Sequence, residues 1–183
     1  MANRIVSILD GFSRILSNLG AVGAGIILLA MIFHILAEIV LRTFFSSTTY
    51  VLEEMIGYGI ATMSFLGLGY AFREGALIRM NLVLVKLGNA FVRRAVEIAC
   101  VVAAATFTAI AAWYFFTNSV RDYVRGHVSE TLSETPLWLP PSIMLVGMVI
   151  FLFQLAIYLV RVAAGQVSFA EEDRDEFRAD GVD

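Results

Sequence analysis

Apolar residues gather in four long runs along the chain, and short segments between the runs hold most of the charged residues. The clearest run is residues 55–72, which are eighteen uncharged residues directly after the acidic pair Glu53 and Glu54. A helix needs about 20 predominantly apolar residues to cross a bilayer. The four runs therefore predict four transmembrane helices, at about residues 19–41, 53–73, 96–119 and 140–161.

Two further segments have the 3.6-residue period of an amphipathic helix. Residues 1–18 place Ile5, Leu9 and Phe12 at helical spacing, with polar residues between them. In residues 76–92 and just beyond, basic side chains recur every seven residues and so share nearly one helical face. We call these the basic stripe: Arg79, Lys86 and Arg93. Both segments are predicted to lie as helices at the membrane interface.

Composition supports the same fold class. Hydrophobic residues make up 59% of the 183 residues and charged residues only 16%, whereas about a quarter of the residues of a soluble domain are charged. The sequence therefore predicts an all-α integral membrane protein with four transmembrane helices and amphipathic interfacial helices, one membrane domain over residues 19–165, and a solvated acidic tail over residues 166–183.

The small residues 21–25 resemble a signal-peptide cleavage site, but the apolar run continues to Ala37. An uncleaved first transmembrane helix is therefore favoured. Ten of the thirteen Lys and Arg residues fall on one side of the predicted spans. By the positive-inside rule, both termini and the 73–94 segment are predicted to be cytoplasmic. The basic residues flank membrane segments, which argues against a nucleic-acid surface.

Small residues four apart in the first span allow close approach of another helix, and the second span carries further ones. The positions are Gly20, Ala21, Ala24 and Gly25, then Gly57, Ala61, Gly67 and Gly69. They favour tight helix packing over a water-filled lumen. No internal repeat is evident, so an inverted-repeat transporter core is not predicted.

His34, Glu38 and Arg42 are four residues apart and share one stripe of the first span. Glu38 would lie about 12 Å from the bilayer centre, near the hydrocarbon edge, so a structural ion pair with Arg42 is favoured over a proton relay. His34 lies deeper and is expected to be a hydrogen-bonded packing residue. The other histidine, His127, falls in an outer loop, so neither a two-histidine haem site nor a metal cluster is predicted.

Glu53 and Glu54 open the second span, where carboxylates suit the helix dipole. For Glu54, an ion-pair clamp with Arg42 or with a partner subunit is as well supported as a simple helix start; for Glu53 the helix start is favoured. Arg73 and Gly75 lead into the basic stripe. That region can signal topology and bind anionic lipid head groups, or form a lateral arm that anchors a larger partner, and the pattern does not separate the two.

Cys100 is the only cysteine, and it lies in an apolar run. It cannot form an intrachain disulfide and is expected to be a small buried hydrophobe. The sequence contains no nucleophile with an adjacent base, no glycine-rich phosphate loop and no metal-binding motif. Enzymatic activity and a bound cofactor are therefore not expected.

The order of several short motifs resembles the small membrane subunit of TRAP transporters, the DctQ-type small permease. The motifs are an arginine after span one, two acids opening span two, and a glycine-rich stretch leading to a basic-acid-glycine turn, followed by a proline-flanked entry to span four. In this chain they read Glu38 to Arg42, Glu53-Glu54, Gly67 to Gly75, Leu77 to Asn81, and Thr135 to Pro140. One departure is at Leu77, near where many relatives have a histidine.

This resemblance implies a non-catalytic scaffold subunit in a bacterial inner membrane. It also implies a large permease partner that holds the substrate and sodium sites, and a periplasmic solute-binding protein that delivers the solute, often a carboxylate. Two other classes stay open from the residues themselves. One is a self-contained small channel or carrier, which would need polar residues on several spans; the other is a membrane sensor or assembly factor whose acidic tail docks a cytosolic partner.

Overall fold

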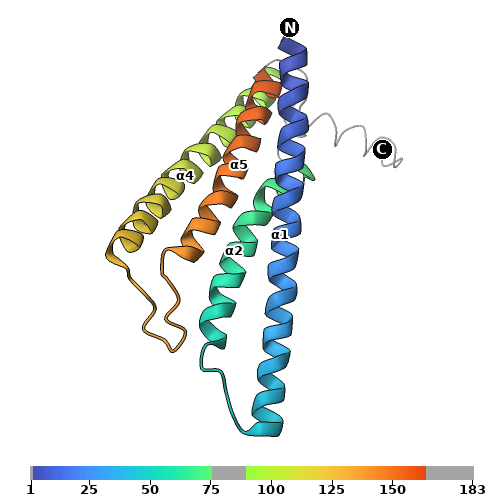
Figure 1. The fold of residues 1–183 in the computed structure, drawn as a ribbon. Coiled ribbons are helices and arrows are strands. Elements are labelled where there is room, and N and C mark those ends of the chain that lie inside the picture. Colours follow the sequence, from blue (N-terminus) through green and yellow to red (C-terminus); the bar gives the residue numbers. More distant parts are fainter. Residues whose placement is uncertain (1, 76–89, 164–183) are drawn as a thin grey trace, which may run out of the picture.

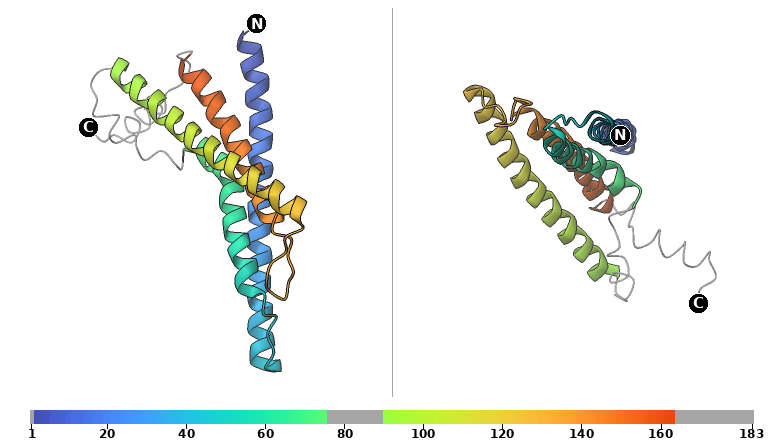
Figure 2. Two further views of the ribbon diagram at one scale, coloured as in Figure 1. Left: turned by 90° about the vertical axis from the view of Figure 1, so that its left-hand side faces the viewer. Right: turned by 90° about the horizontal axis from the view of Figure 1, so that it is seen from below.

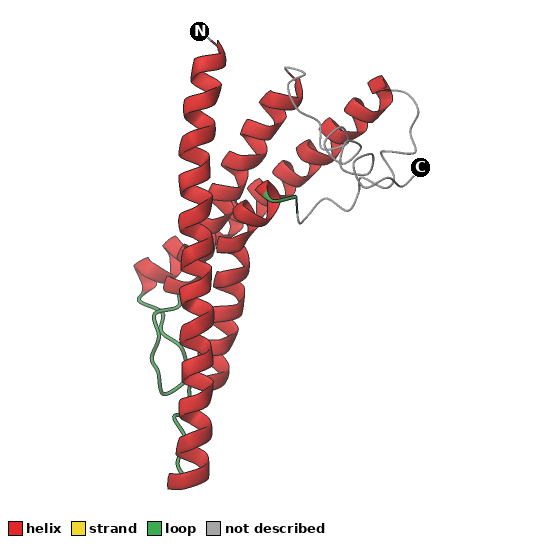
Figure 3. Cartoon of the chain, turned by 90° about the vertical axis from the view of Figure 1, so that its right-hand side faces the viewer, coloured by secondary structure: helices red, strands yellow, loops and turns green. Residues whose placement is uncertain are grey.

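The computed structural model describes residues 2–75 and 90–163, and it consists of four long helices (Figure 1). They are α1 (Ala2–Phe45), α2 (Leu52–Arg73), α4 (Ala90–Arg125) and α5 (Leu139–Ala163). No strand is drawn within these ranges (Figure 3), and their only β-type pairing is a single bridge between Val128 and Pro136. Each helix is long and apolar enough to cross a membrane, which confirms the predicted all-helical membrane class.

The first helix is longer than one span. Residues 2–18, expected as a separate interfacial helix, continue without a break into the first span, so that α1 has 44 residues. No proline interrupts this stretch. At about 1.5 Å per residue, α1 is about 66 Å long, roughly twice the thickness of the hydrocarbon core. A tilt alone does not absorb that excess, so part of α1 extends beyond the membrane.

The third span is also longer than predicted, because α4 begins at Ala90 and ends at Arg125. The predicted interfacial helix at 76–92 lies almost wholly outside the described residues, as does the acidic tail at 166–183. The same is true of Arg79 and Lys86, and of the side chain of Arg93.

The helices are arranged with α2 and α5 in the middle and α1 and α4 at the edges. α1 packs along α2 and touches α5 near its own N-terminal end, whereas α4 packs on α5 and leans away from α1 (Figures 1 and 2). The start of α1 and the end of α5 lie at one end of the bundle, which we call the inner end; the α1–α2 and α4–α5 loops lie towards the other, the outer end (Figure 1).

A buried apolar cluster holds α2, α4 and α5 together towards the inner end. Its centre is Phe72, whose ring makes edge-to-face contacts with Phe151 at 5.7 Å and with Tyr158 at 5.4 Å between centroids. Leu155 and Val162 are each only 1% exposed. Burying such side chains between helices excludes water from this part of the bundle.

The middle of the bundle is closed by glycines that face helix backbone. A Cβ atom at Gly20 of α1 would lie 2.7 Å from the carbonyl oxygen of Leu66, and one at Gly147 of α5 would lie 2.4 Å from the carbonyl oxygen of Phe65. The Phe65–Leu66 segment of α2 is thus approached by a glycine from either side. Only a residue without a side chain allows helices so close.

Only some of the glycines that were predicted to pack between helices do so. Gly69 does meet Ile150, since a Cβ atom there would be 2.9 Å from the Ile150 side chain. In contrast, Gly25, Gly57 and Gly67 have no atom within 4 Å of such a Cβ. Among residues 2–75 and 90–163, these three glycines make no close contact with another helix, so the expected tight packing is not seen there.

Candidate functional site

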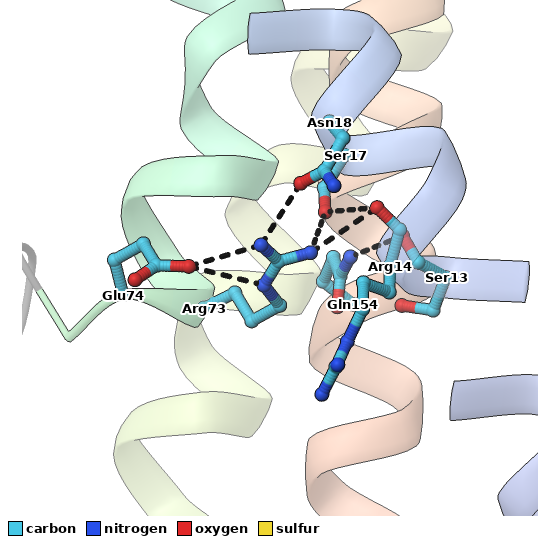
Figure 4. A network of polar contacts seen from close by, with 7 residues as sticks. All are labelled: Ser13, Arg14, Ser17, Asn18, Arg73, Glu74 and Gln154. Carbon is cyan, nitrogen blue, oxygen red and sulfur yellow. Dashed lines mark hydrogen bonds and ion pairs between the residues drawn. The ribbon is translucent and has the colours of Figure 1, made fainter. Parts of the chain in front are cut away.

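Arg73, the last residue of α2, binds three residues of α1 (Figure 4). Its Nη1 atom donates to the carbonyl oxygen of Arg14 at 3.1 Å and to Ser17 Oγ at 2.9 Å, and its Nη2 atom donates to Asn18 Oδ1 at 2.9 Å. Glu74 Oε1 accepts from the same guanidinium at 2.9 Å. A planar fork of five donors is suited to hold several acceptors at once, so this side chain fastens α2 to α1.

The position of Arg73 follows from the way α2 ends. The Glu74 amide donates to the carbonyl of Tyr70 at 3.0 Å, and the Gly75 amide donates to that of Phe72 at 3.2 Å. Gly75 has a φ of 72°, a left-handed conformation that glycine adopts without strain. Gly75 therefore stops the helix directly after Arg73, with the guanidinium facing α1.

The third helix of this junction is α5, which contributes Gln154. Its Nε2 atom donates to the carbonyl oxygen of Ser13 at 2.9 Å (Figure 4). One to two turns further along, Arg161 Nη1 lies 3.6 Å from Asp10 Oδ1. Ser13 and Ser17 are at most 1% exposed, because small side chains at these two positions let all three helices meet. We call the contacts of Arg73 and Gln154 with α1 the inner junction.

A second inner contact joins α4 to α5. Tyr158 Oη donates a hydrogen bond to Glu97 Oε1, and both residues are buried, at 6% and 5% exposed. Burying a carboxylate is costly unless it is hydrogen-bonded. Sequence reasoning missed this pair, because Glu97 stands near the start of an apolar run and its partner lies 61 positions away.

At the outer end, Glu38 holds the α1–α2 loop. Glu38 is only 1% exposed. Its carboxylate accepts from Arg42 Nε at 2.9 Å, from the Thr49 amide at 3.1 Å and Thr49 Oγ1 at 2.7 Å, and from Thr48 Oγ1. The predicted Glu38–Arg42 pair is therefore confirmed as a contact. The two threonines were missed, although a Ser/Thr run after a buried acid is a usable signal, since its hydroxyls can fold back onto the carboxylate.

Glu54 at the start of α2 holds the other outer loop. Its Oε2 atom accepts from Ser133 Oγ at 3.0 Å and from Thr131 Oγ1. The loop is itself folded back as a hairpin, with the Ser129 amide donating to the carbonyl of Thr135 at 2.9 Å. The alternative in which Glu54 pairs with Arg42 is thus wrong: Arg42 binds Glu38 and Glu54 binds loop hydroxyls.

The region that contains these contacts matches a known family. Residues 31–165 match the sequence model of the family described as tripartite ATP-independent periplasmic transporters, DctQ component. The matched range covers about three quarters of the chain. The chain belongs to this family. It is thus a multi-pass small membrane component of a TRAP transporter. Comparison with curated proteins and with solved structures found no match.

The matched range includes both outer carboxylates, Arg73, Gly75 and Gln154, but begins after Ser13 and Ser17. Residues 2–30 of α1, which supply the acceptors of the inner junction, therefore lie outside the match. The two side chains that donate to these acceptors, Arg73 of α2 and Gln154 of α5, lie within the matched range.

The remaining candidate residues do not gather into a site. Glu53 is exposed, consistent with a simple helix start. His34 Nε2 is buried and has no hydrogen-bond partner among the described residues, so the expected hydrogen bond is not seen at this atom. Cys100 is exposed on α4, which corrects the expectation that it is buried. Residues 2–75 and 90–163 contain no cluster able to hold a metal ion.

Proposed function

We propose that this chain is a rigid scaffold for the large permease of its transporter and carries no solute itself. The observation that supports this most strongly is where the buried charged groups lie. Glu38 lies near the outer end, and Glu97 lies near the inner end. Between them, glycine contacts close α1, α2 and α5 on one another. A wet solute path would need polar side chains through this middle section.

The contacts at the two ends also suit a fixed element. The inner junction fastens α1 to α2 and α5, and Tyr158 fastens α5 to α4. At the outer end, carboxylates hold both loops. Polar contacts spread over all four helices oppose relative motion of the helices, which is what a support for a moving permease requires.

We further propose the partners and solute class that membership of the family implies. The large permease would hold the substrate and sodium sites, and a periplasmic solute-binding protein would deliver a carboxylate. Exposed apolar side chains along α1 and α4, such as Leu29, Phe33, Phe107 and Ile110, offer surface for the permease and for lipid. We propose no cofactor, no catalytic step and no contact with nucleic acid for this chain.

We propose a bacterial inner-membrane location with both termini cytoplasmic. The excess of Lys and Arg on one side supports this orientation, as does the position of the start of α1 and the end of α5 at one end of the bundle. A single cysteine in place of Gly126 should react with a membrane-impermeant maleimide added to intact spheroplasts, in a Cys100→Ala background. A cysteine in place of Glu74 should react only after lysis. The opposite labelling pattern would reverse the proposed orientation.

The scaffold proposal is tested with liposomes that contain one of three protein samples: the chain alone, the chain with the large permease, or the large permease alone. The full chain alone should give no sodium-dependent carboxylate uptake with the binding protein outside, whereas the chain with the large permease should give uptake. The large permease alone should be inactive or should fail to reconstitute. Uptake by the chain alone would overturn the proposal, and so would full uptake by the large permease without the chain.

A further inference from the structure

A small apolar groove lies between α1 and α5 at the inner end of the bundle. It has a volume of about 170 Å³ and is lined by Leu9, Phe153, Ala156, Ile157 and Val160. The two helices touch beside it, where the ring of Phe12 meets that of Phe153 edge-on at 6.1 Å between centroids. Leu9 is 39% exposed and Val160 is 54% exposed, so the groove is open on one side within the described part of the chain.

The groove lies beyond the inner end of α2. Arg73, the last residue of α2, binds α1 at residues 14–18, and Gln154 of α5 binds α1 at the preceding residue (Figure 4). Leu9 and Val160 lie further towards the inner end, and Val160 is about 9 Å beyond Gln154 along α5. The charge of Arg73 thus lies between the groove and the middle of the bundle. Apolar side chains on the polar side of such a charge gain free energy when another part of the protein covers them.

The segment that follows α5 is better placed to cover the groove than the segment that follows α2. With 3.6 residues per turn, Leu9 and Phe12 lie on α1 roughly opposite Asn18, which binds the last residue of α2. The chain therefore leaves α2 on the far side of α1 from the groove. In contrast, α5 ends at Ala163, about 5 Å beyond Val160, and the chain leaves it directly beside the groove.

The sequence after α5 contains a side chain that suits the groove. Gly165 comes two positions after the end of α5, and a glycine just past a helix lets the chain reverse its direction. Phe169 follows. Six residues span at most about 21 Å, whereas Ile157 is only about 9 Å back along α5 from Ala163. An apolar cavity of about 150 Å³ holds a benzene ring, so a groove of about 170 Å³ has room for the ring of Phe169.

The charges on either side of the groove agree with this placement. Arg161 Nη1 lies 3.6 Å from Asp10 Oδ1, which is an ion pair but too long for a hydrogen bond. Along the described ranges no hydrogen bond from the Arg161 guanidinium is seen, and its side chain is 34% exposed. Residues 171–176 contain five carboxylates and one arginine. Carboxylates that follow Phe169 so closely can reach this guanidinium and accept its free N–H donors.

We propose that the tail folds back along α5, places the ring of Phe169 in the groove and brings the acidic run 171–176 beside Arg161. The tail then covers Leu9 and Val160. It also adds a contact between α1 and α5 beyond the inner junction. This inference goes beyond the scaffold function and depends on neither the solute nor the membrane orientation.

Disulfide trapping in the full chain tests the fold-back. In a Cys100→Ala background, Val160→Cys places a thiol at the groove and Ala170→Cys places one next to Phe169, so the ring itself is kept. The protein is oxidised mildly in lipid nanodiscs, and the remaining thiols are counted by gel shift with a polyethylene glycol maleimide. We expect a disulfide in most chains. Phe169→Ala should lower the yield by about fivefold, because the tail loses the buried ring that holds it. Arg161→Gln should lower it about twofold.

The matched control is Phe177→Ala, which makes the same change eight residues further along the tail and should leave the yield unchanged. Moving the groove thiol to Val149, an exposed position three turns away on α5, should lower the yield at least about fivefold. Equal yields for Phe169→Ala and Phe177→Ala, or for thiols at 160 and 149, would overturn the proposal. An unchanged yield in Arg161→Gln would overturn the placement of the acidic run. Loss of the disulfide when the large permease is added would show that a partner occupies the groove, and would overturn the proposal as well.

Discussion

The close contact between α5 and α2 makes Gly147→Ala the sharpest test of the packing described above. The added Cβ atom would lie 2.4 Å from the Phe65 carbonyl oxygen, 2.5 Å from its carbonyl carbon and 2.7 Å from the Leu66 amide nitrogen. All three atoms belong to helix backbone, so no side chain can rotate away to make room. The helices themselves have to separate.

The size of the effect follows from the distance. Favourable contacts between heavy atoms begin near 3.5 Å, so α5 must move about 1 Å from α2. A gap of that size forfeits roughly a quarter to a half of the dispersion energy of the contacts it opens, and overpacking of this kind costs about 1–3 kcal/mol. Replacing a helical glycine by alanine returns roughly 0.5–1 kcal/mol. We therefore expect Gly147→Ala to lower the free energy of unfolding by about 1–2 kcal/mol.

Gly67→Ala is the matched control, since a Cβ atom at Gly67 of α2 meets nothing within 4 Å. It should leave the free energy of unfolding unchanged or raise it by up to about 1 kcal/mol. The assay is a reversible SDS titration of the full chain in mixed micelles, followed by circular dichroism and by tryptophan fluorescence. Equal unfolding free energies for the two variants would refute the claim that α2 and α5 meet through the glycine.

Three further predictions concern the polar contacts at the two ends. Arg73→Lys should lower the free energy of unfolding by about 1–2 kcal/mol, because an ammonium group cannot reproduce the fork that binds α1; the same SDS titration measures it, and an unchanged value would contradict the inner junction. Glu38→Gln should speed proteolysis of the α1–α2 loop from the outer side, whereas Glu53→Gln should not; equal rates would contradict the role of the buried carboxylate. A double-mutant cycle between Arg42 and Glu54 should give a coupling energy within about 0.5 kcal/mol of zero. Reversing both charges together should not rescue any assembly that a single reversal loses. If it did, a direct ion pair between Arg42 and Glu54 would be supported after all.

Most of the fold could be predicted from the sequence because membrane spans are encoded locally. Each span is a continuous apolar run, and the charges at residues 53, 54 and 73 mark the ends of α2 almost to the residue. The extension of α1 through residues 2–18 was harder to predict, since an amphipathic start suits both an interfacial helix and a continuation of the span. The absence of proline and of a clear stop signal favours continuation, and the helix does continue.

The contacts at the two ends depended on information that one sequence does not hold. Glu38 and Arg42 are four residues apart on one helix, so their pairing could be predicted from helical geometry alone. The partners of Glu54 lie 77 and 79 positions away. To predict Ser133 instead of Arg42 as the partner of Glu54, one would have to know which loop lies over the start of α2. Gly147 shows the same limit, because its role depends on which helix packs against it.

The arrangement of polar contacts explains how an elongated set of helices can behave as one body. α4 packs on α5 and is otherwise largely uncovered by the rest of the described chain, so apolar packing alone would leave it free to swing about that one interface. Tyr158 fixes its inner half through Glu97, and Glu54 holds the loop that follows its outer end. α1 is fixed in the same way, by Arg73 near its start and by Glu38 near its end. In hydrocarbon, apolar side chains gain little from choosing one apolar neighbour over another, whereas a buried carboxylate or guanidinium loses its partners if the helix moves. The polar ends therefore set the relative positions of the helices, and the glycines set how closely they approach.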